Sequence, residues 1–134
     1  MRLLNEVVIV TGATGGIGDA QCRLFARERA KVVVADINED KGLKLANEIS
    51  GGGGSTLFVN LDVSSESDWN SLVEITLDRF SKIDVLVNNA AIRPSSPFLE
   101  MDELEWERVL AIGMHAPFWL ARAILPAVSY THLP

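Results

Sequence analysis

The sequence predicts an α/β protein of the Rossmann type, with a doubly wound parallel sheet that is incomplete and has about four strands. Short apolar runs alternate along the chain with longer segments in which apolar residues recur at helical spacing. A glycine cluster follows the first run, and polar residues end the later ones. The carboxyl ends of parallel strands gather at one edge of the sheet, where such folds bind ligands. The pattern therefore predicts a fold and the place of a site together.

Four short runs are apolar at nearly every position, which is typical of strands buried on both faces of a parallel sheet. These runs are 7–10, 32–35, 57–61 and 85–87. The segments that directly follow them contain glycine, aspartate and asparagine instead. They are Gly12–Gly18, Asp36, Asp62 and Asn88–Ala90. We expect all four segments at the carboxyl edge of the sheet.

Amphipathic segments separate the strands and predict helices on both faces of the sheet. They cover about 16–29, 39–49, 66–80 and 102–125. Ser65 and Asp68 are spaced like a capping box and mark the start of the third helix. The run Gly51–Gly54 predicts a loose surface turn. Alternation of strand and helix predicts right-handed crossovers.

Composition excludes several classes of function. The 134 residues include 12 basic and 18 acidic side chains, a net charge of −6, which disfavours nucleic-acid binding. A single cysteine, Cys22, permits no internal disulfide, and with only two histidines no zinc spacing exists. The acidic residues between Glu100 and Glu107 suit a helix start better than a metal site. We expect a cytoplasmic protein without metal, nucleic-acid or membrane partners.

The glycine cluster joins the first strand to the first helix. Glycine permits a sharp turn and a close approach to a ligand, and the helix N-terminus adds free N–H donors. Together they predict a pyrophosphate site at Gly12–Gly18. A nucleotide-triphosphatase loop would need lysine after its last glycine, but Asp19 follows Gly18.

Asp36 lies 18 residues beyond Gly18, at the end of the second strand. A carboxylate there can accept hydrogen bonds from both ribose hydroxyls and would repel a 2′-phosphate. Gly15 offers that phosphate no basic partner, so Asp36 and Gly15 together favour NAD over NADP. Two alternatives stay open at this point: a cap for the helix after Ile37, and the acid of a methyltransferase that uses S-adenosylmethionine.

Three motifs together resemble the short-chain dehydrogenase/reductase family. They are Thr11-Gly-x-x-x-Gly16-x-Gly18, Leu61-Asp62-Val63 and Asn88-Asn89-Ala90. They occur in the family's order at the family's elements, over about residues 3–127. The resemblance displaces the methyltransferase reading. It implies an NAD-dependent oxidoreductase that moves a hydride between nicotinamide and an alcohol or ketone, and a homo-oligomer at full length.

The resemblance also implies a cofactor site. Its residues are Gly12, Thr14, Gly15, Gly16, Ile17, Gly18, Asp36, Ile37, Asp62, Val63, Asn89 and Ala90. In it the glycines hold the pyrophosphate, and Thr14 lies near the adenosine ribose. Asp62 accepts a hydrogen bond from the adenine amino group. Asn89 and Ala90 flank the nicotinamide-side ribose, while Asn88 is the more structural asparagine.

The chain departs from the family toward its end. Gly113 stands where the family has an asparagine of the proton relay. Tyr130 is the only tyrosine, and Pro134 stands where the family's lysine would follow. We therefore expect a partial dinucleotide-binding domain over 1–127, a non-native tail over 128–134 and no catalytic residue within the chain. A non-catalytic dinucleotide-binding or regulatory module is the alternative.

Overall fold

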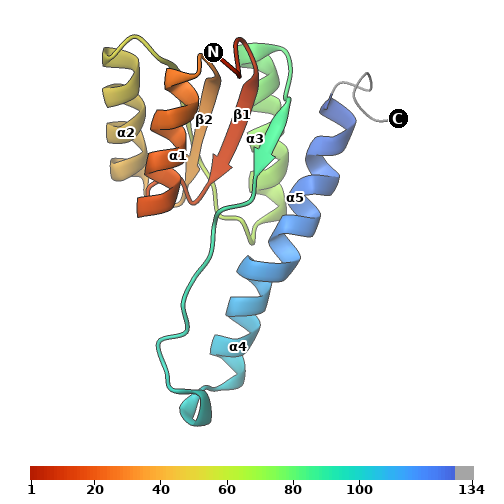
Figure 1. The fold of residues 1–134 in the computed structure, drawn as a ribbon. Helices are drawn as coiled ribbons and strands as arrows, with labels where there is room; N and C mark the ends of the chain where they lie inside the picture. Colours follow the sequence, from red (N-terminus) through yellow and green to blue (C-terminus); the bar gives the residue numbers. More distant parts are fainter. Residues whose placement is uncertain (129–134) are drawn as a thin grey trace.

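A parallel sheet forms the centre of the molecule (Figure 1). The computed structural model describes residues 1–128, and within them the sheet has four strands in the order β3-β2-β1-β4. The strands are β1 (Val7–Thr11), β2 (Lys31–Asp36), β3 (Ser55–Asn60) and β4 (Val85–Val87). All three pairings are parallel. The predicted α/β Rossmann-type class is confirmed, and the strand ends differ from the predicted ones by at most two residues.

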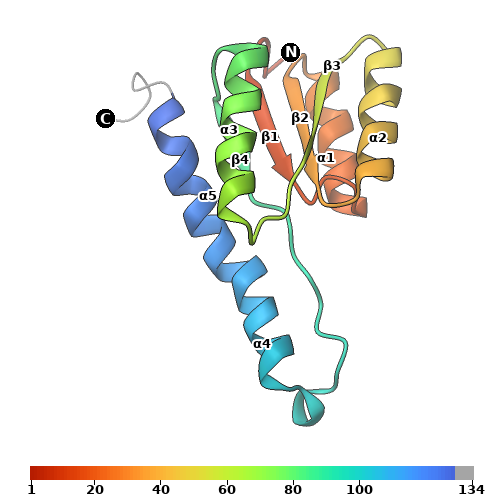
Figure 2. The ribbon, with the colours of Figure 1, turned by 180° about the vertical axis from the view of Figure 1, so that it is seen from behind.

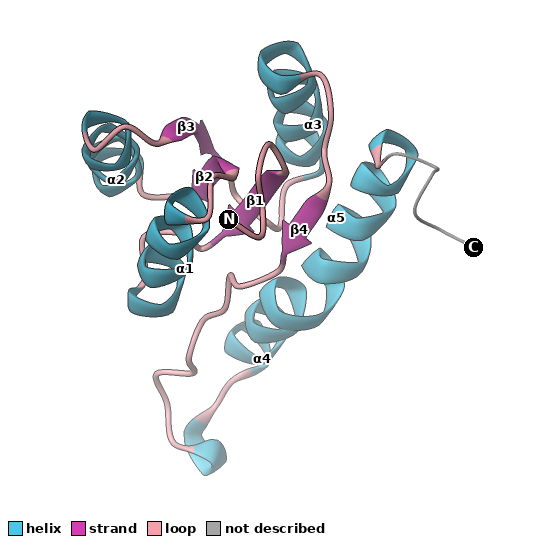
Figure 3. Cartoon of the chain, turned by 45° about the horizontal axis from the view of Figure 1, so that its top comes forward, coloured by secondary structure: helices cyan, strands magenta, loops and turns pink. Residues whose placement is uncertain are grey.

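Helices cover both faces of the sheet (Figure 3). The helices α1 (Gly16–Arg27) and α2 (Glu39–Gly51) lie on one face, and α3 (Glu66–Phe80) and α5 (Ala116–Ile124) lie on the other. Alternate residues of β1 serve the two cores, because side chains of a strand point to opposite faces. Val8 and Val10 pack with α1 and α2, whereas Val7 and Ile9 pack with α3 and α5.

Polar side chains close several helix ends. The Ser65 hydroxyl accepts a hydrogen bond from the Asp68 N–H at 3.4 Å, as the capping-box spacing predicts. Asn38 caps α2 in the same way, with its side-chain oxygen 3.0 Å from the Lys41 nitrogen. Cys22 is buried between α1 and the sheet, and burial raises the pKa of its thiol to about 12. This cysteine is therefore an inert core residue.

The last helix is interrupted in a way that the sequence pattern does not show. It consists of α4 (Glu103–Leu110), the π-helical turn η2 (Ala111–His115), α5 and the 3₁₀ turn η3 (Leu125–Ala127). The loop after β4, the short turn η1 (Phe98–Glu100) and α4 extend beyond the carboxyl ends of the strands (Figure 2). By length and composition alone, the run Glu103–Ala127 could cross a membrane. In the structure, α5 packs on the core through Ala116, Leu120 and Ile124.

The described chain ends beside the sheet. Ile83 and Val128 form an isolated parallel bridge, one residue beyond the predicted domain end at residue 127. The other residues of the predicted tail, Tyr130 and Pro134 among them, lie outside the described residues. The predicted boundary at residue 127 therefore stays a prediction.

Candidate functional site: a cavity at the carboxyl edge of the sheet

Two glycines of the loop after β1 are required by the protein's own packing. Gly12 has φ +60°, in the left-handed region that favours glycine, and a Cβ there would lie 2.7 Å from the Ala90 Cα. A Cβ at Gly18 would lie 2.8 Å from the Ala13 Cα. Because backbone atoms cannot yield easily, any larger residue at either position must displace the loop.

Gly15 and Gly16 have a different environment. A Cβ at Gly16 would meet no atom within 4 Å, and one at Gly15 would only touch the Gly12 oxygen at 3.6 Å. Fold packing therefore does not explain glycine at these two positions. Both line an open cavity, where a bare backbone lets a ligand approach closely.

Thr11 and Asn89 fasten the glycine loop to the end of β4. The buried Thr11 hydroxyl accepts hydrogen bonds from the N–H groups of Asn89 and Ala90, both at 3.1 Å. The Asn89 side-chain amide donates to the carbonyl oxygens of Thr11 and Gly12, both at 3.0 Å. These contacts hold the turn of the loop in place.

The expected roles of the two asparagines need a correction. We expected Asn88 to be the more structural residue, but Asn89 makes the structural hydrogen bonds. Asn88 is exposed, and its side chain makes no hydrogen bond within residues 1–128. The reason is that the Asn89 side chain reaches the backbone of the glycine loop, whereas the Asn88 side chain is exposed.

Asp36 ends β2 and braces the glycine loop. One carboxylate oxygen accepts from the Thr14 N–H at 2.9 Å, and the other accepts from the Asn38 N–H at 2.9 Å. Asn38 is the cap of α2, so the capping alternative for Asp36 is wrong. The side chain is only 8% exposed, yet it lines the cavity. Each oxygen of a carboxylate has a second lone pair, so Asp36 can still accept from a ligand.

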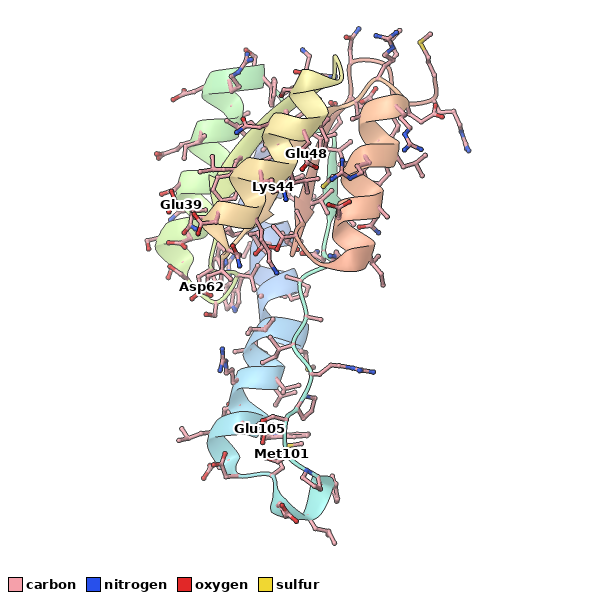
Figure 4. All side chains as sticks on the ribbon, turned by 90° about the vertical axis from the view of Figure 1, so that its left-hand side faces the viewer. Glu39, Lys44, Glu48, Asp62, Met101 and Glu105 are labelled. Carbon is pink, nitrogen blue, oxygen red and sulfur yellow. The ribbon has the colours of Figure 1, made fainter. Side chains whose placement is uncertain are left out.

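Asp62 follows β3 and lies at the same edge of the sheet (Figure 4). Its carboxylate accepts from the Ser64 N–H at 2.9 Å and the Ser64 hydroxyl at 2.6 Å. Its own N–H donates to the Asp68 carboxylate at 2.8 Å. The next residue, Val63, is held by the Trp69 indole, which donates to its carbonyl oxygen at 2.7 Å. The backbone beside this part of the cavity is thus fixed from α3.

These segments enclose a cavity of about 600 Å³. Eleven of the twelve predicted site residues line it; Thr14 does not, although its N–H contacts Asp36. Six lining residues were not predicted. They are Leu61, Ala91, Ile92, Arg93, Arg108 and Ile112. Adjacency to the motifs could have indicated the first four, and the four-residue spacing of Arg108 and Ile112 on α4 could have indicated a shared face.

Glu105 attaches the loop after β4 to α4. Its carboxylate accepts from the N–H and the hydroxyl of Ser95, the latter at 2.9 Å, and from the Ser96 N–H at 3.1 Å. Hydrogen bonds from Ser96, through its side chain and its backbone, and from Ser95 lower the pKa of Glu105 to about 2. Figure 4 shows Glu105 on α4, farther from the sheet than Asp62. This contact fixes the loop that carries Ile92 and Arg93 into the cavity.

The position expected for a relay asparagine falls in the π-turn. Gly113 lies within η2, next to the cavity residue Ile112, and a Cβ at Gly113 would meet no atom within 4 Å. Space for a larger side chain therefore exists, and glycine is not imposed by packing. Among residues 1–128, no three histidine, cysteine, aspartate or glutamate side chains gather where they could hold a metal ion.

Comparison with known proteins identifies the family. The family model described as short chain dehydrogenase matches residues 6–132. A cyclopentanol dehydrogenase of Comamonas testosteroni is 36% identical over 131 residues, which cover 98% of this chain and 52% of that protein. The chain therefore belongs to the short-chain dehydrogenase family, whose members bind nicotinamide cofactors.

Solved structures agree with this assignment. A short-chain dehydrogenase/reductase from Brucella melitensis superposes with a TM-score of 0.89 at 31% identity, over 96% of this chain and 54% of that one. A metagenomic short-chain oxidoreductase, solved in complex with NADP, gives 0.87 at 32% identity, over 95% of this chain and 58% of that one. The chain thus spans about half the length of the relatives that it matches.

Proposed function

We propose that this chain is the cofactor-binding portion of an NAD-dependent oxidoreductase that moves a hydride between nicotinamide and an alcohol or ketone. One observation carries the proposal: the bare backbone of Gly16 and the carboxylate of Asp36 line the same cavity, at the N-terminus of α1. The first can accept a diphosphate, and the second can accept ribose hydroxyls.

The proposed cofactor contacts follow the walls of the cavity. The diphosphate lies along Gly15–Gly18, where the first N–H groups of α1 are free to donate. The ribose hydroxyls bind Asp36, beside Ile37. The adenine lies near Asp62 and Val63, and the nicotinamide half of the cofactor passes Asn89 and Ala90.

NAD is the preferred cofactor in this proposal. A 2′-phosphate would bring negative charge beside the Asp36 carboxylate, and Gly15 provides no compensating cation. We expect the ratio of the dissociation constants of NADP and NAD, measured by calorimetry, to exceed about 10 in the unmodified chain and to fall several-fold in Asp36→Ala. An unchanged ratio in a variant that melts normally would remove Asp36 from cofactor selection.

The chain as given is proposed to bind the dinucleotide without turning over an alcohol. Gly113 provides no side chain for a proton relay, and no tyrosine lies within residues 1–128. The relative from Comamonas testosteroni acts on a cyclic secondary alcohol by its name, so cyclopentanol is a suitable probe. We expect no NADH absorbance to appear with NAD and cyclopentanol. Measurable turnover would show that the chain is catalytically sufficient.

A non-catalytic dinucleotide-binding module is the second candidate, and Gly113 is the observation that favours it. The two candidates differ in the longer protein. If the chain is joined to the second half of a family member and still fails to oxidise alcohols while binding NAD, the module is correct. Restored turnover supports the oxidoreductase.

We further propose a homo-oligomer at full length and a cytoplasmic location. Trp106, Phe118 and Trp119 of the long helix are all substantially exposed. Exposed aromatic side chains on one helix are typical of an interface. The reduced, buried Cys22 is consistent with a reducing compartment.

A further inference from the structure

Two arginines line the cavity on the wall formed by the loop after β4 and by α4. Arg93 belongs to the loop and Arg108 to the helix, so two separate elements bring positive charge to one space. Figure 2 shows these two elements running together beyond the carboxyl ends of the strands. Neither arginine belongs to the motifs of the nucleotide site.

Neither arginine has a counter-charge in the described part of the chain. No ion pair involving Arg93 or Arg108 forms within residues 1–128. The helix positions four residues from Arg108 are Leu104 and Ile112, which are apolar. Glu105, three residues away, is already bound to the loop serines. In a chain of net charge −6, two exposed arginines without an ion-pair partner thus line one cavity, where both are available to an anionic ligand.

Three other arginines of the chain have partners within the described residues. Arg23 pairs with Asp19 at 2.6 Å and with Glu48 at 2.7 Å. Arg79 and Arg122 lie over aromatic rings, 5.1 Å and 5.4 Å from the ring centres. Arg27 and Arg29, which also form no ion pair within residues 1–128, lie away from this cavity, beside the turn after α2.

The charges of the cavity are separated. Its acidic residues, Asp36 and Asp62, follow β2 and β3, whereas its basic residues come from the loop after β4 and from α4. An anionic group is therefore repelled by the first wall and attracted by the second. Ile92 directly precedes Arg93, and Ile112 lies four residues after Arg108; both isoleucines line the cavity. The basic wall therefore also offers apolar surface. This combination suits a carboxylate joined to a hydrocarbon body, because a guanidinium binds carboxylates through paired hydrogen bonds.

We propose that Arg93 and Arg108 bind the carboxylate of the substrate, so that the alcohol or ketone handled at this site is a hydroxy acid or an oxo acid with an apolar body. The inference deepens the proposed function and rests on it. In the oxidation, the hydroxyl carbon gives a hydride to the nicotinamide of NAD, the hydroxyl proton is released to solvent water, and the carboxylate is unchanged. The two arginines position the substrate and take no part in the proton or hydride transfer.

The test separates the two anions that this wall could bind, a substrate carboxylate and the cofactor diphosphate. Cyclohexanecarboxylate and cyclohexanol are titrated into the chain by ligand-observed NMR, with and without NAD, and NAD alone is titrated by calorimetry. We expect the carboxylate to bind about tenfold more tightly than the neutral alcohol, and its affinity to fall with added salt. Arg93→Gln and Arg108→Gln should each weaken carboxylate binding by about fivefold and leave NAD affinity within about twofold.

Arg122→Gln is the matched control, because it removes one arginine charge from α5 outside the cavity. It should change neither affinity, and thermal melts verify that all three variants are folded. Equal binding of acid and alcohol, or no binding of the acid, overturns the proposal. Loss of NAD affinity in Arg93→Gln or Arg108→Gln also overturns it and assigns the arginines to the diphosphate. If the unmodified chain does not bind NAD, the proposed function is contradicted. The carboxylate titration without NAD tests the two arginines separately, so the two failures can be told apart.

Discussion

At the scale of single residues, the glycines of one loop divide into two kinds. Gly18 is packed against backbone, so the fold requires it, whereas the α-carbon of Gly16 faces open space. Sequence spacing alone treats the two as equivalent members of one motif. The difference gives each glycine a separate experimental signature.

We expect Gly18→Ala to destabilise the protein by about 1–3 kcal/mol, because its Cβ would overlap the backbone of Ala13. Gly16→Ala should leave the unfolding free energy nearly unchanged and weaken NAD binding about tenfold, because its Cβ would occupy the space proposed for the diphosphate. Urea unfolding and calorimetry measure the two effects. Full NAD affinity in a folded Gly16→Ala variant would contradict the proposed path of the cofactor.

Single site residues could be predicted where a residue type suited to a ligand also stands at the end of a predicted strand. A small-residue loop after a strand and an acid at the next strand end are visible in the sequence, and both line the cavity. The roles of Asn88 and Asn89 were not separable, because both carry the same amide. Only the folded structure shows which of the two amides reaches the carbonyl oxygens of Thr11 and Gly12.

At the scale of elements, α2 packs closely against β3, and Gly42 is the point of nearest approach to Phe58. A Cβ built on Gly42 would overlap the ring of Phe58, so the helix approaches the strand at a position that has no side chain. Gly42 therefore has a packing reason, although glycine inside a helix costs about 1 kcal/mol relative to alanine.

We expect Gly42→Ala to destabilise the protein by about 1–3 kcal/mol despite the better helix propensity of alanine. Gly51→Ala, at the open end of the same helix, is the matched control and should be neutral or slightly stabilising. Phe58→Leu should recover part of the loss in a double-mutant cycle measured by urea unfolding. Additive effects of Gly42→Ala and Phe58→Leu would show that the two residues do not interact.

The attachment of the loop to α4 depends on the charge of Glu105. Its pKa is lowered from the ordinary value of 4.5 to about 2, so the attachment is complete above about pH 4.5 and is lost as pH falls through about 2. We expect the amide proton shifts of Ser95 and Ser96 to titrate with a midpoint near pH 2. Glu105→Gln should abolish this titration, and a midpoint near 4.5 would mean that the contact does not form in solution.

Element-scale prediction placed each helix and strand but missed the π-turn. The apolar pattern from 102 to 125 indicates one helix. A single π-helical turn changes the hydrogen bonds of only a few residues, so it hardly alters the spacing of the apolar residues. For the same reason the cavity residues of α4 were missed. Their partners in the cavity wall include the ends of β1 and β2, which lie more than 70 residues earlier in the chain, so only the folded structure brings them together.

At the scale of the whole molecule, β4 is an edge strand. Within the described residues its ladder partner is β1 alone, and Val85 is 36% exposed. Phe98, Leu104 and Phe118 add further exposed apolar surface, with Leu104 81% exposed. An unpaired apolar edge promotes association with other chains.

We expect the chain to self-associate at micromolar to millimolar concentration and Val85→Lys to reduce this association, because lysine disfavours edge pairing. Sedimentation velocity measures the change. Leu43→Lys is the control, since it removes an exposed apolar side chain from α2, away from the edge. An equal effect of both substitutions would indicate general stickiness rather than association through β4.

Fold class and crossover rules predicted a parallel sheet, and the structure confirms it. The order β3-β2-β1-β4 is not contained in the alternation of strands and helices. The strand order depends on which face of the sheet each helix covers. Alternate residues of β1 pack into the two cores that these helices form on opposite faces.

The π-turn affects which residues of the long helix lie on the same side. Steps of four residues link Arg108, Ile112, Ala116, Leu120 and Ile124; the first two line the cavity and the last three lie in the core. In a regular α-helix such a stripe drifts by about 40° per step, whereas a π-turn holds more residues per turn and takes back part of this drift. One continuous helical segment therefore lines the ligand space at one end and packs in the interior of the protein at the other. The helix that supplies Arg108 and Ile112 to the cavity is thus anchored in the core by Ala116, Leu120 and Ile124.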